Sequence, residues 1–259
     1  MTSSALSVTW WGHAGVTVGV GGVRVLTDPL LVDRLAHLRR QAPSVPAAAR
    51  RADVVLVSHL HADHLHVGSL RQVDPRATLV VPRGAAPLVS SLPHEVVEVE
   101  AGQHVAVGGV EVQVLPATHD DRRHPASSLR ATAVGFRFSV AGRSVWFPGD
   151  TGPRDDHADV APVDLGLVPV GGWGPSLGDG HLTPEQAADA TRAVGCRWAL
   201  PVHHGTLWPM GLRHLDPAGF RRWFTDPAPR FAALLAGDAV EVVQARHNTP
   251  LLLAVGDGD

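Results

Sequence analysis

Residues 58–65 read Ser-His-Leu-His-Ala-Asp-His-Leu and directly follow the apolar run Val54–Val57. Imidazole and carboxylate side chains are the ligands that borderline divalent ions such as zinc accept, and a loop leaving a strand can turn several of them toward one point. The alternative is a polar loop that is merely rich in histidine, since the chain has 16 His. Four such side chains within six residues favour a metal site instead. The candidates are His59, His61, Asp63 and His64.

With 44% hydrophobic residues, the chain is long enough for one large domain with a substantial core or for two small domains. Because α/β proteins of this size often form a single domain, we expect one domain spanning residues 1–259. The net charge is −3 and the arginines are scattered, so we expect no nucleic-acid partner and no polybasic membrane patch. No apolar run reaches the roughly 18 residues of a spanning helix. Residues 1–4 contain no basic region leading into an apolar stretch, so we expect no signal peptide. We therefore expect a cytoplasmic protein without a transmembrane segment.

The chain contains no lysine, no tyrosine and no isoleucine. A Schiff-base lysine, a P-loop lysine and a tyrosine general acid are therefore excluded. The single cysteine, Cys196, cannot form an internal disulfide. We expect it to be a small buried residue between a helix and a strand rather than a nucleophile.

Hydrophobic periodicity predicts many short strands and few helices. The expected strands are Leu6–Trp11, Val16–Val20, Val23–Leu26, Ala52–Val57, Thr78–Val81, Glu95–Val99, His104–Val107, Val110–Leu115, Thr132–Val140, Ser144–Phe147, Leu165–Val168, Trp198–Val202, Val240–Val243 and Leu251–Val255. The expected helices are Val67–Val73, Phe220–Phe224 and Pro184–Val194, the last with Thr183 as N-cap and Gln186 completing a capping box. We expect a loop or short helix over residues 30–51 and a glycine-rich loop over 171–180.

Four further places put a potential ligand just after an apolar run or a loop. They are His119, Asp150, His181 and the pair His203 and His204. Each alone is more often a surface or hydrogen-bonded residue. Together they indicate a functional site, because strand ends at one edge of a sheet converge on a shared cleft where binding sites form.

Four motifs resemble, in order, the metal motifs of the metallo-β-lactamase fold superfamily. They are His59-Leu-His61-Ala-Asp63-His64, Pro116-Ala-Thr-His119, Gly149-Asp150-Thr151-Gly152 and Val202-His203-His204-Gly205-Thr206. Three further stretches are similar to the branch that contains ascorbate-6-phosphate lactonases and N-acyl-phosphatidylethanolamine-hydrolysing phospholipases D: Trp11-Gly12-His13-Ala14-Gly15, Thr27-Asp28-Pro29 and His181-Leu-Thr-Pro-Glu185. The resemblance covers most of the chain and implies a four-layer αβ/βα sandwich with the site at one end of the sheets.

The resemblance also implies two divalent metal ions. One would be held by His59, His61 and His119, the other by Asp63, His64 and His203, with Asp150 bridging them. Such a pair lowers the pKa of a bound water enough to supply hydroxide at neutral pH. Asp63 would also orient that hydroxide, which makes it a catalytic candidate. An imidazole at His61, where the family's di-iron members carry a carboxylate, favours zinc, with manganese as the alternative.

Four residues are candidates for substrate contacts. His203 and His204 could both reach a metal, and the family motif aligns His203 with the ligand and leaves His204 beside the substrate. His181 is expected to bind a substrate oxygen or to protonate the leaving group, the alternative being a helix neighbour without chemistry. Arg122 and Arg123 could hold a phosphate, or could equally pair with acidic neighbours in a solvated turn.

Two residues of the opening strands are expected to be structural. His13 would line the floor of the cleft, and Asp28 would accept a hydrogen bond from a ligand. The remaining histidines are expected at the surface or in packing: His37, His66, His94, His104, His124, His157, His214 and His247.

These expectations point to a metal-dependent hydrolase of a small ester, lactone or phosphodiester, which acts as a monomer or a homo-oligomer. One alternative is a nuclease-like phosphodiesterase of the same fold, which would need a basic groove. Another is a non-catalytic metal-binding scaffold protein, which would be expected to lack at least one ligand. A lipid substrate would need an exposed apolar entry face, to which Leu30–Leu38 and Leu207–Leu215 could contribute.

Overall fold

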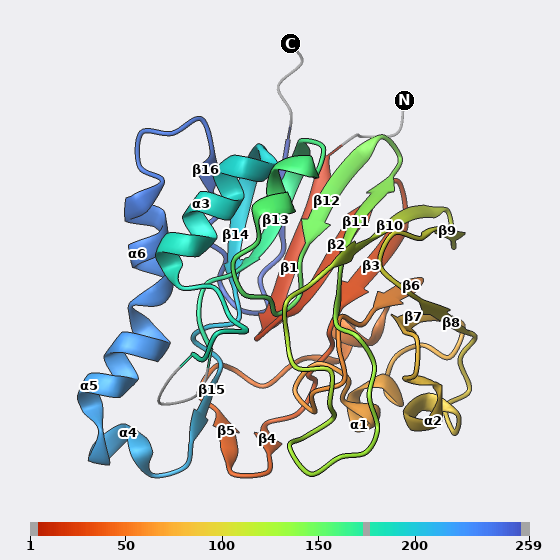
Figure 1. Ribbon diagram of the computed structural model, residues 1–259, viewed down its shortest axis with the longest axis horizontal. Helices are drawn as coiled ribbons and strands as arrows, with labels where there is room; N and C mark the ends of the chain where they lie inside the picture. The colour runs from red at the N-terminus through yellow and green to blue at the C-terminus, as the bar shows by residue number, and fades with distance from the viewer. Residues whose placement is uncertain (1–4, 173–176, 255–259) are drawn as a thin grey trace.

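Two seven-stranded sheets pack face to face in the computed structural model, which describes residues 5–172 and 177–254 (Figure 1). The first sheet has the order β17-β1-β2-β3-β6-β7-β8, with β17 (Leu251–Leu253), β1 (Leu6–Gly12), β2 (Gly15–Val20), β3 (Val23–Thr27), β6 (Val54–Leu56), β7 (Thr78–Pro82) and β8 (Val96–Val99). The second has the order β16-β14-β13-β12-β11-β10-β9, with β16 (Glu241–Val242), β14 (Cys196–Val202), β13 (Val163–Pro169), β12 (Arg143–Phe147), β11 (Val134–Val140), β10 (Val110–Pro116) and β9 (His104–Val107).

Helices cover the outer face of each sheet. The first sheet is covered by η1 (Ala47–Arg50), α1 (Val67–Leu70) and α2 (Ala86–Val89), and the second by η2 (Asp155–Asp159), α3 (Pro184–Val194) and α6 (Pro227–Leu234). Alternating apolar residues of both sheets, such as Val16 and Phe136, form the central core. The order helix, sheet, sheet, helix confirms the predicted four-layer αβ/βα sandwich.

The predicted capping box of α3 is confirmed. The backbone nitrogen of Gln186 donates to Thr183 Oγ1 at 3.3 Å, and the backbone nitrogen of Thr183 donates to Gln186 Oε1 at 2.9 Å. Gly195 ends the helix in the left-handed conformation, with φ +71°, which glycine adopts without a steric penalty.

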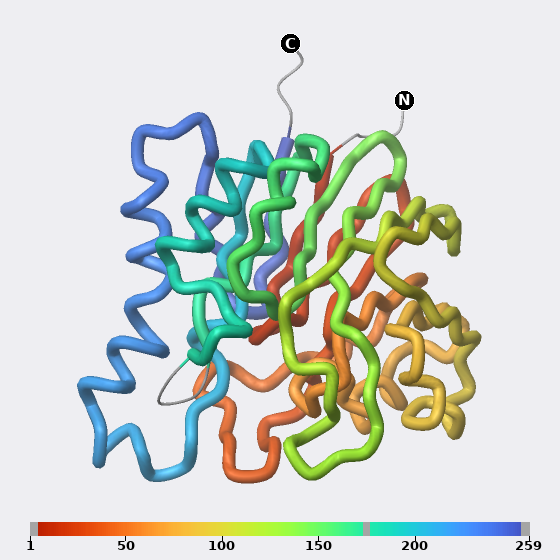
Figure 2. The backbone as a smooth tube through the Cα atoms, in the orientation of Figure 1, coloured from red at the N-terminus to blue at the C-terminus, as the bar shows by residue number. Residues whose placement is uncertain are grey.

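A small third sheet was not predicted. Its order is β15-β5-β4, with β15 (Leu207–Pro209), β5 (Leu38–Arg40) and β4 (Arg34–Leu35). Figure 2 shows that β15 lies beside the β4–β5 hairpin although the two are far apart in the sequence. Sequence periodicity cannot detect such short strands, because their pairing is decided by a distant segment.

Several predicted boundaries differ from the structure. The helix expected at Val67–Val73 is the single turn α1, followed by Asp74-Pro75, and Pro75 disfavours helix in the residue before it. The helix expected at Phe220–Phe224 spans the end of α5 (Pro217–Phe220) and the π-helical η3 (Arg221–Thr225), while α4 (Leu212–Leu215) and α6 were not predicted. Val255 and residues 173–176 of the predicted glycine-rich loop lie outside the described residues. Within the described ranges, no helix is long and apolar enough to cross a membrane.

Candidate metal centre

The predicted ligands lie in loops that follow strands at one edge of the two sheets. His59, His61, Asp63 and His64 follow β6, His119 follows β10, Asp150 follows β12 and His203 follows β14. The fold thus brings together residues from four separate parts of the chain. This is the convergence that the spacing of the motifs predicted.

One group consists of the three imidazoles of His59, His61 and His119. His59 Nε2 and His119 Nε2 each lie 3.0 Å from His61 Nδ1. The ligand atoms of the three rings all lie within 4.8 Å of one another. This arrangement can provide three nitrogen ligands to one ion, which is typical of protein zinc sites.

A second group is centred on His64 and His203, whose Nε2 atoms are 3.2 Å apart. Asp150 Oδ2 lies 3.1 Å from both of these nitrogens, and Asp63 Oδ2 lies 3.9 Å from His64 Nε2. Asp150 also belongs to a potential ligand group with His119 and His181. Its carboxylate therefore lies between the two groups, where the resemblance places a bridging ligand.

Hydrogen bonds from Nδ1 orient the imidazole rings of two candidate ligands. His119 Nδ1 donates to the carbonyl of Gly180, and His203 Nδ1 donates to the carbonyl of Gly171, each at 2.8 Å. A neutral imidazole has one N–H, so these bonds leave a lone pair on Nε2 of both rings. Partners of this kind orient metal-binding histidines in general.

Burial keeps the three-histidine group neutral. It lowers the pKa of His59 well below the ordinary value and the pKa of His119 to about 4. Burial also acts to lower the pKa of His64, but the nearby carboxylates of Asp150, Asp28 and Asp63 raise it well above its ordinary value. The second group therefore favours a positive charge beside His64.

The donor set fits divalent metal ions. In neutral His64 and His203, Nδ1 donates to an oxygen acceptor, so the two Nε2 atoms face each other with lone pairs at 3.2 Å. These lone pairs repel unless a cation lies between them. Asp150 Oδ1 is buried and has no hydrogen-bond partner among the described residues. An unpaired buried carboxylate oxygen is costly, and a metal ion would satisfy it. Nitrogen and carboxylate ligands together suit zinc or manganese.

Of the four residues predicted to contact substrate, two line the cavity beside the candidate ligands and two do not. His181 lies at the centre, with Nε2 3.3 Å from Asp150 Oδ2, and lines the adjoining cavity. Arg123 lines the same cavity, and its Nη1 donates to the carbonyls of Leu60 and Leu65 in the ligand loop.

Arg122 and His204 lie elsewhere. Arg122 pairs with Asp120 through Nε and Nη2, at 2.9 and 2.7 Å, which is the internal pairing weighed as the alternative. His204 lines a separate cavity, and its ring centroid lies 4.9 Å from that of Trp10. The positions of both residues therefore argue against direct substrate contact.

Both supporting residues contact candidate ligands, which was expected for Asp28, whereas His13 is buried and does not line the cavity beside the ligands. His13 Nε2 lies 3.0 Å from Asp63 Oδ2, and Asp28 Oδ2 lies 2.6 Å from His64 Nδ1. Ser58 was missed: its hydroxyl donates to Asp28 and lies 2.9 Å from His59 Nδ1. Its position directly before the first ligand was the one available signal.

A cavity of about 470 Å³ opens beside the metal ligands. Its lining combines Asp63, Asp150, His61, His181 and His203 with Leu35, Ala36, His37, Leu38, Ala62, Arg123, His124, Pro125, Gly172 and Leu177. The β4–β5 hairpin, which was not predicted from the sequence, thus forms one wall of this cavity.

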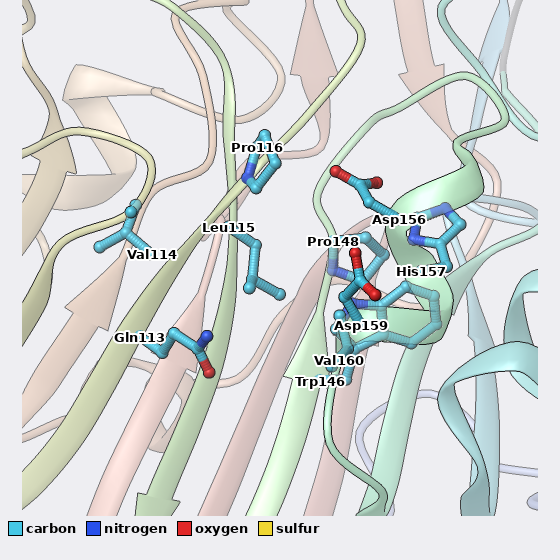
Figure 3. Close-up of a pocket in the computed structure, with 11 residues that line it drawn as sticks. Gln113, Val114, Leu115, Pro116, Trp146, Pro148, Asp156, His157, Asp159 and Val160 are labelled. Atoms are coloured by element: carbon cyan, nitrogen blue, oxygen red, sulfur yellow. The ribbon is translucent and has the colours of Figure 1, made fainter.

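A smaller cavity of about 200 Å³ lies away from the ligands, between β10, β12 and η2 (Figure 3). His157 lines it, with its ring centroid 5.3 Å from that of Trp146. This placement agrees with the packing role expected for His157.

Residues 23–204 match the model of the beta-lactamase superfamily domain. The chain belongs to the beta-lactamase superfamily. An uncharacterized protein of Mycobacterium tuberculosis is 33% identical over 224 residues, covering 79% of this chain and 60% of the relative. A UPF0173 metal-dependent hydrolase of Methanopyrus kandleri is 31% identical, covering 84% of this chain and 90% of the relative. This chain therefore spans about 60% of the length of the first of these relatives.

One relative belongs, by its name, to the predicted branch. N-acyl-phosphatidylethanolamine-hydrolyzing phospholipase D 1 of Caenorhabditis elegans is 28% identical, covering 83% of this chain and 68% of the relative. Among solved structures, the metallo hydrolase Igni18 of Ignicoccus hospitalis superposes with a TM-score of 0.72 at 18% identity, covering 97% of this chain and 99% of Igni18. The predicted metallo-β-lactamase fold is confirmed.

Proposed function

We propose that this chain is a metal-dependent hydrolase that uses two divalent ions to cleave a small ester, lactone or phosphodiester. The observation that carries the proposal is the position of Asp150, whose Oδ2 lies 3.1 Å from the Nε2 atoms of His64 and His203 and 3.3 Å from His181 Nε2. The relatives named as metal-dependent hydrolase and phospholipase D support it. We favour zinc, with manganese as the alternative.

The residues of the chain divide the chemistry between them. When bound, the two ions would acidify a water and polarise the scissile carbonyl or phosphoryl group. Asp63 lines the cavity and would orient the attacking water. His181 is a quarter exposed and lies on the cavity wall, so it would donate a proton to the departing oxygen.

The two alternatives find less support. A nuclease-like phosphodiesterase would need a basic groove, but Arg122 is paired with Asp120 and Arg123 with backbone carbonyls. A non-catalytic scaffold would be expected to lack a ligand, whereas all seven candidates occur in the sequence.

The test is elemental analysis of gently purified protein, paired with hydrolysis of a chromogenic phosphodiester and a panel of esters and lactones. Wild type is compared with Asp150→Ala and with Asp155→Ala, a control at an exposed aspartate. We expect about two zinc or manganese ions per wild-type chain, as in two-metal hydrolases, and loss of turnover in Asp150→Ala alone. Metal-free protein that cannot be reconstituted would overturn the proposal.

A further inference from the structure

Apart from the candidate ligands, much of the cavity lining is apolar. Leu35, Ala36 and Leu38 come from the β4–β5 hairpin, Ala62 from the ligand loop, and Leu177 from the segment before α3. Pro125 adds a further apolar surface. These side chains come from segments far apart in the sequence, so the apolar wall is a product of the fold.

Few charged groups face this wall. Among the described lining residues, Arg123 is the single arginine, and its Nη1 is already hydrogen bonded to the carbonyls of Leu60 and Leu65. The carboxylates of Asp63 and Asp150 lie on the ligand side. Two histidines, His37 and His124, also line the cavity, so Arg123 is not its only basic side chain. An anionic group placed against the leucine and alanine side chains of the wall would lose its hydration there, which is unfavourable.

The hairpin wall is held in place by a buried arginine. Arg40 is 6% exposed and donates to the carbonyls of Leu30, Trp11 and Val32 at 2.6, 2.9 and 3.2 Å. These bonds fix both the base of the hairpin and the segment that leads into it. The wall is therefore formed before a substrate binds, which favours recognition of shape and apolar surface.

We propose that the cavity selects carboxylic esters or lactones whose acyl group is apolar and uncharged. The proposal rests on the proposed hydrolase function and adds the class of substrate. The scissile bond lies at the metal ligands, and the acyl group lies along the hairpin wall formed by Leu35 and Leu38. Each methylene added to the acyl group gains binding from burial, about two- to fourfold.

A substrate pair of equal length tests the selectivity. The 4-nitrophenyl esters of butyric acid and of succinic acid (as the half-ester) differ in a terminal methyl against a carboxylate. We expect kcat/KM to be at least about tenfold higher for the butyrate, and to rise from acetate to octanoate. Equal rates for the pair, or no dependence on length, would overturn the inference but leave the hydrolase function intact. Cleavage of the chromogenic phosphodiester without hydrolysis of any ester or lactone would also overturn the inference and leave the hydrolase function intact. No hydrolysis of any of the three substrate classes would instead count against the proposed function.

A binding experiment separates the apolar wall from catalysis. Saturation-transfer NMR with 2-butanone and 2-octanone, which cannot be hydrolysed, is run before and after chelation of the metal. We expect 2-octanone to bind more tightly in both states, and to lose most of this binding in Leu35→Gln and Leu177→Gln. Leu252→Gln is the control, because Leu252 is 75% exposed and lies outside the cavity. Equal binding by all four proteins would overturn the inference.

Discussion

Asp28 Oδ2 lies 2.6 Å from His64 Nδ1, and both residues are fully buried. The same carboxylate accepts hydrogen bonds from the backbone nitrogen and the hydroxyl of Ser58, at 2.8 and 2.6 Å. One side chain at the end of β3 thus orients His64 and, through Ser58, His59. Asp28 therefore links the two groups of candidate ligands.

Asp28→Asn is expected to weaken metal binding by about 10- to 100-fold, because the amide cannot match the carboxylate as an acceptor for both His64 and Ser58. Competition with a coloured chelator measures the affinity. Asp74→Asn, at a partly exposed aspartate paired with Arg76, is the control and should leave the affinity unchanged. Equal affinities for the two variants would contradict the role of Asp28.

Arg123→Gln and Arg122→Gln change neighbouring residues, and we expect them to affect the stability of the protein differently. Loss of the Arg123 bonds leaves the carbonyls of Leu60 and Leu65 without their donor, so we expect the free energy of unfolding to fall by about 1–3 kcal/mol. Arg122 makes a partly exposed pair with Asp120, and its loss should cost no more than about 0.5 kcal/mol. Urea unfolding of chelator-treated protein measures both. If Arg122→Gln proved the more damaging change, the assignment would be wrong.

Gly149→Ala is expected to disturb the carboxylate of Asp150, the proposed bridging ligand that follows it. Gly149 has φ +64°, and a Cβ there would overlap the side chain of Ser58. Gly142 has a similar φ of +77° but nothing within 4 Å of its Cβ position, so Gly142→Ala isolates the backbone strain. We expect the free energy of unfolding to fall by about 1 kcal/mol in Gly142→Ala and by about 1–3 kcal/mol more in Gly149→Ala.

Urea unfolding and metal content of the two glycine variants check this. Reduced metal content should occur in Gly149→Ala alone, because only Gly149 adjoins the ligand Asp150. Identical losses of stability would show that strain, not overlap with Ser58, decides the outcome.

Cys196 is expected to be unreactive in the native protein. Burial raises the pKa of its thiol to about 12, so at pH 8 only about one thiol in ten thousand is the reactive thiolate. In unfolded protein, with the ordinary pKa of 9.0, the fraction is about one in ten. Labelling with a disulfide reagent at pH 8 should therefore be slow in buffer and fast in guanidinium chloride. Fast labelling of folded protein would show that the thiol is accessible.

Much of the fold could be predicted from the sequence, because the local pattern of residues agrees with the tertiary structure. The alternation in residues 16–20 and 134–140 marks strands with one buried face, and Thr183 with Gln186 marks the start of α3. The ligand motifs were also local, since His59 to His64 lie within six residues after one strand.

The sequence by itself determined which side chains are available as ligands, because donor chemistry and position after a strand are properties of the local chain. The tertiary structure decided how they are used. Only the packing of distant segments places Asp150 between two groups of histidines, turns His204 toward Trp10 and brings the β4–β5 hairpin to the cavity. These relationships depend on the direction of side chains across separate strands and loops, and no period along the chain encodes them.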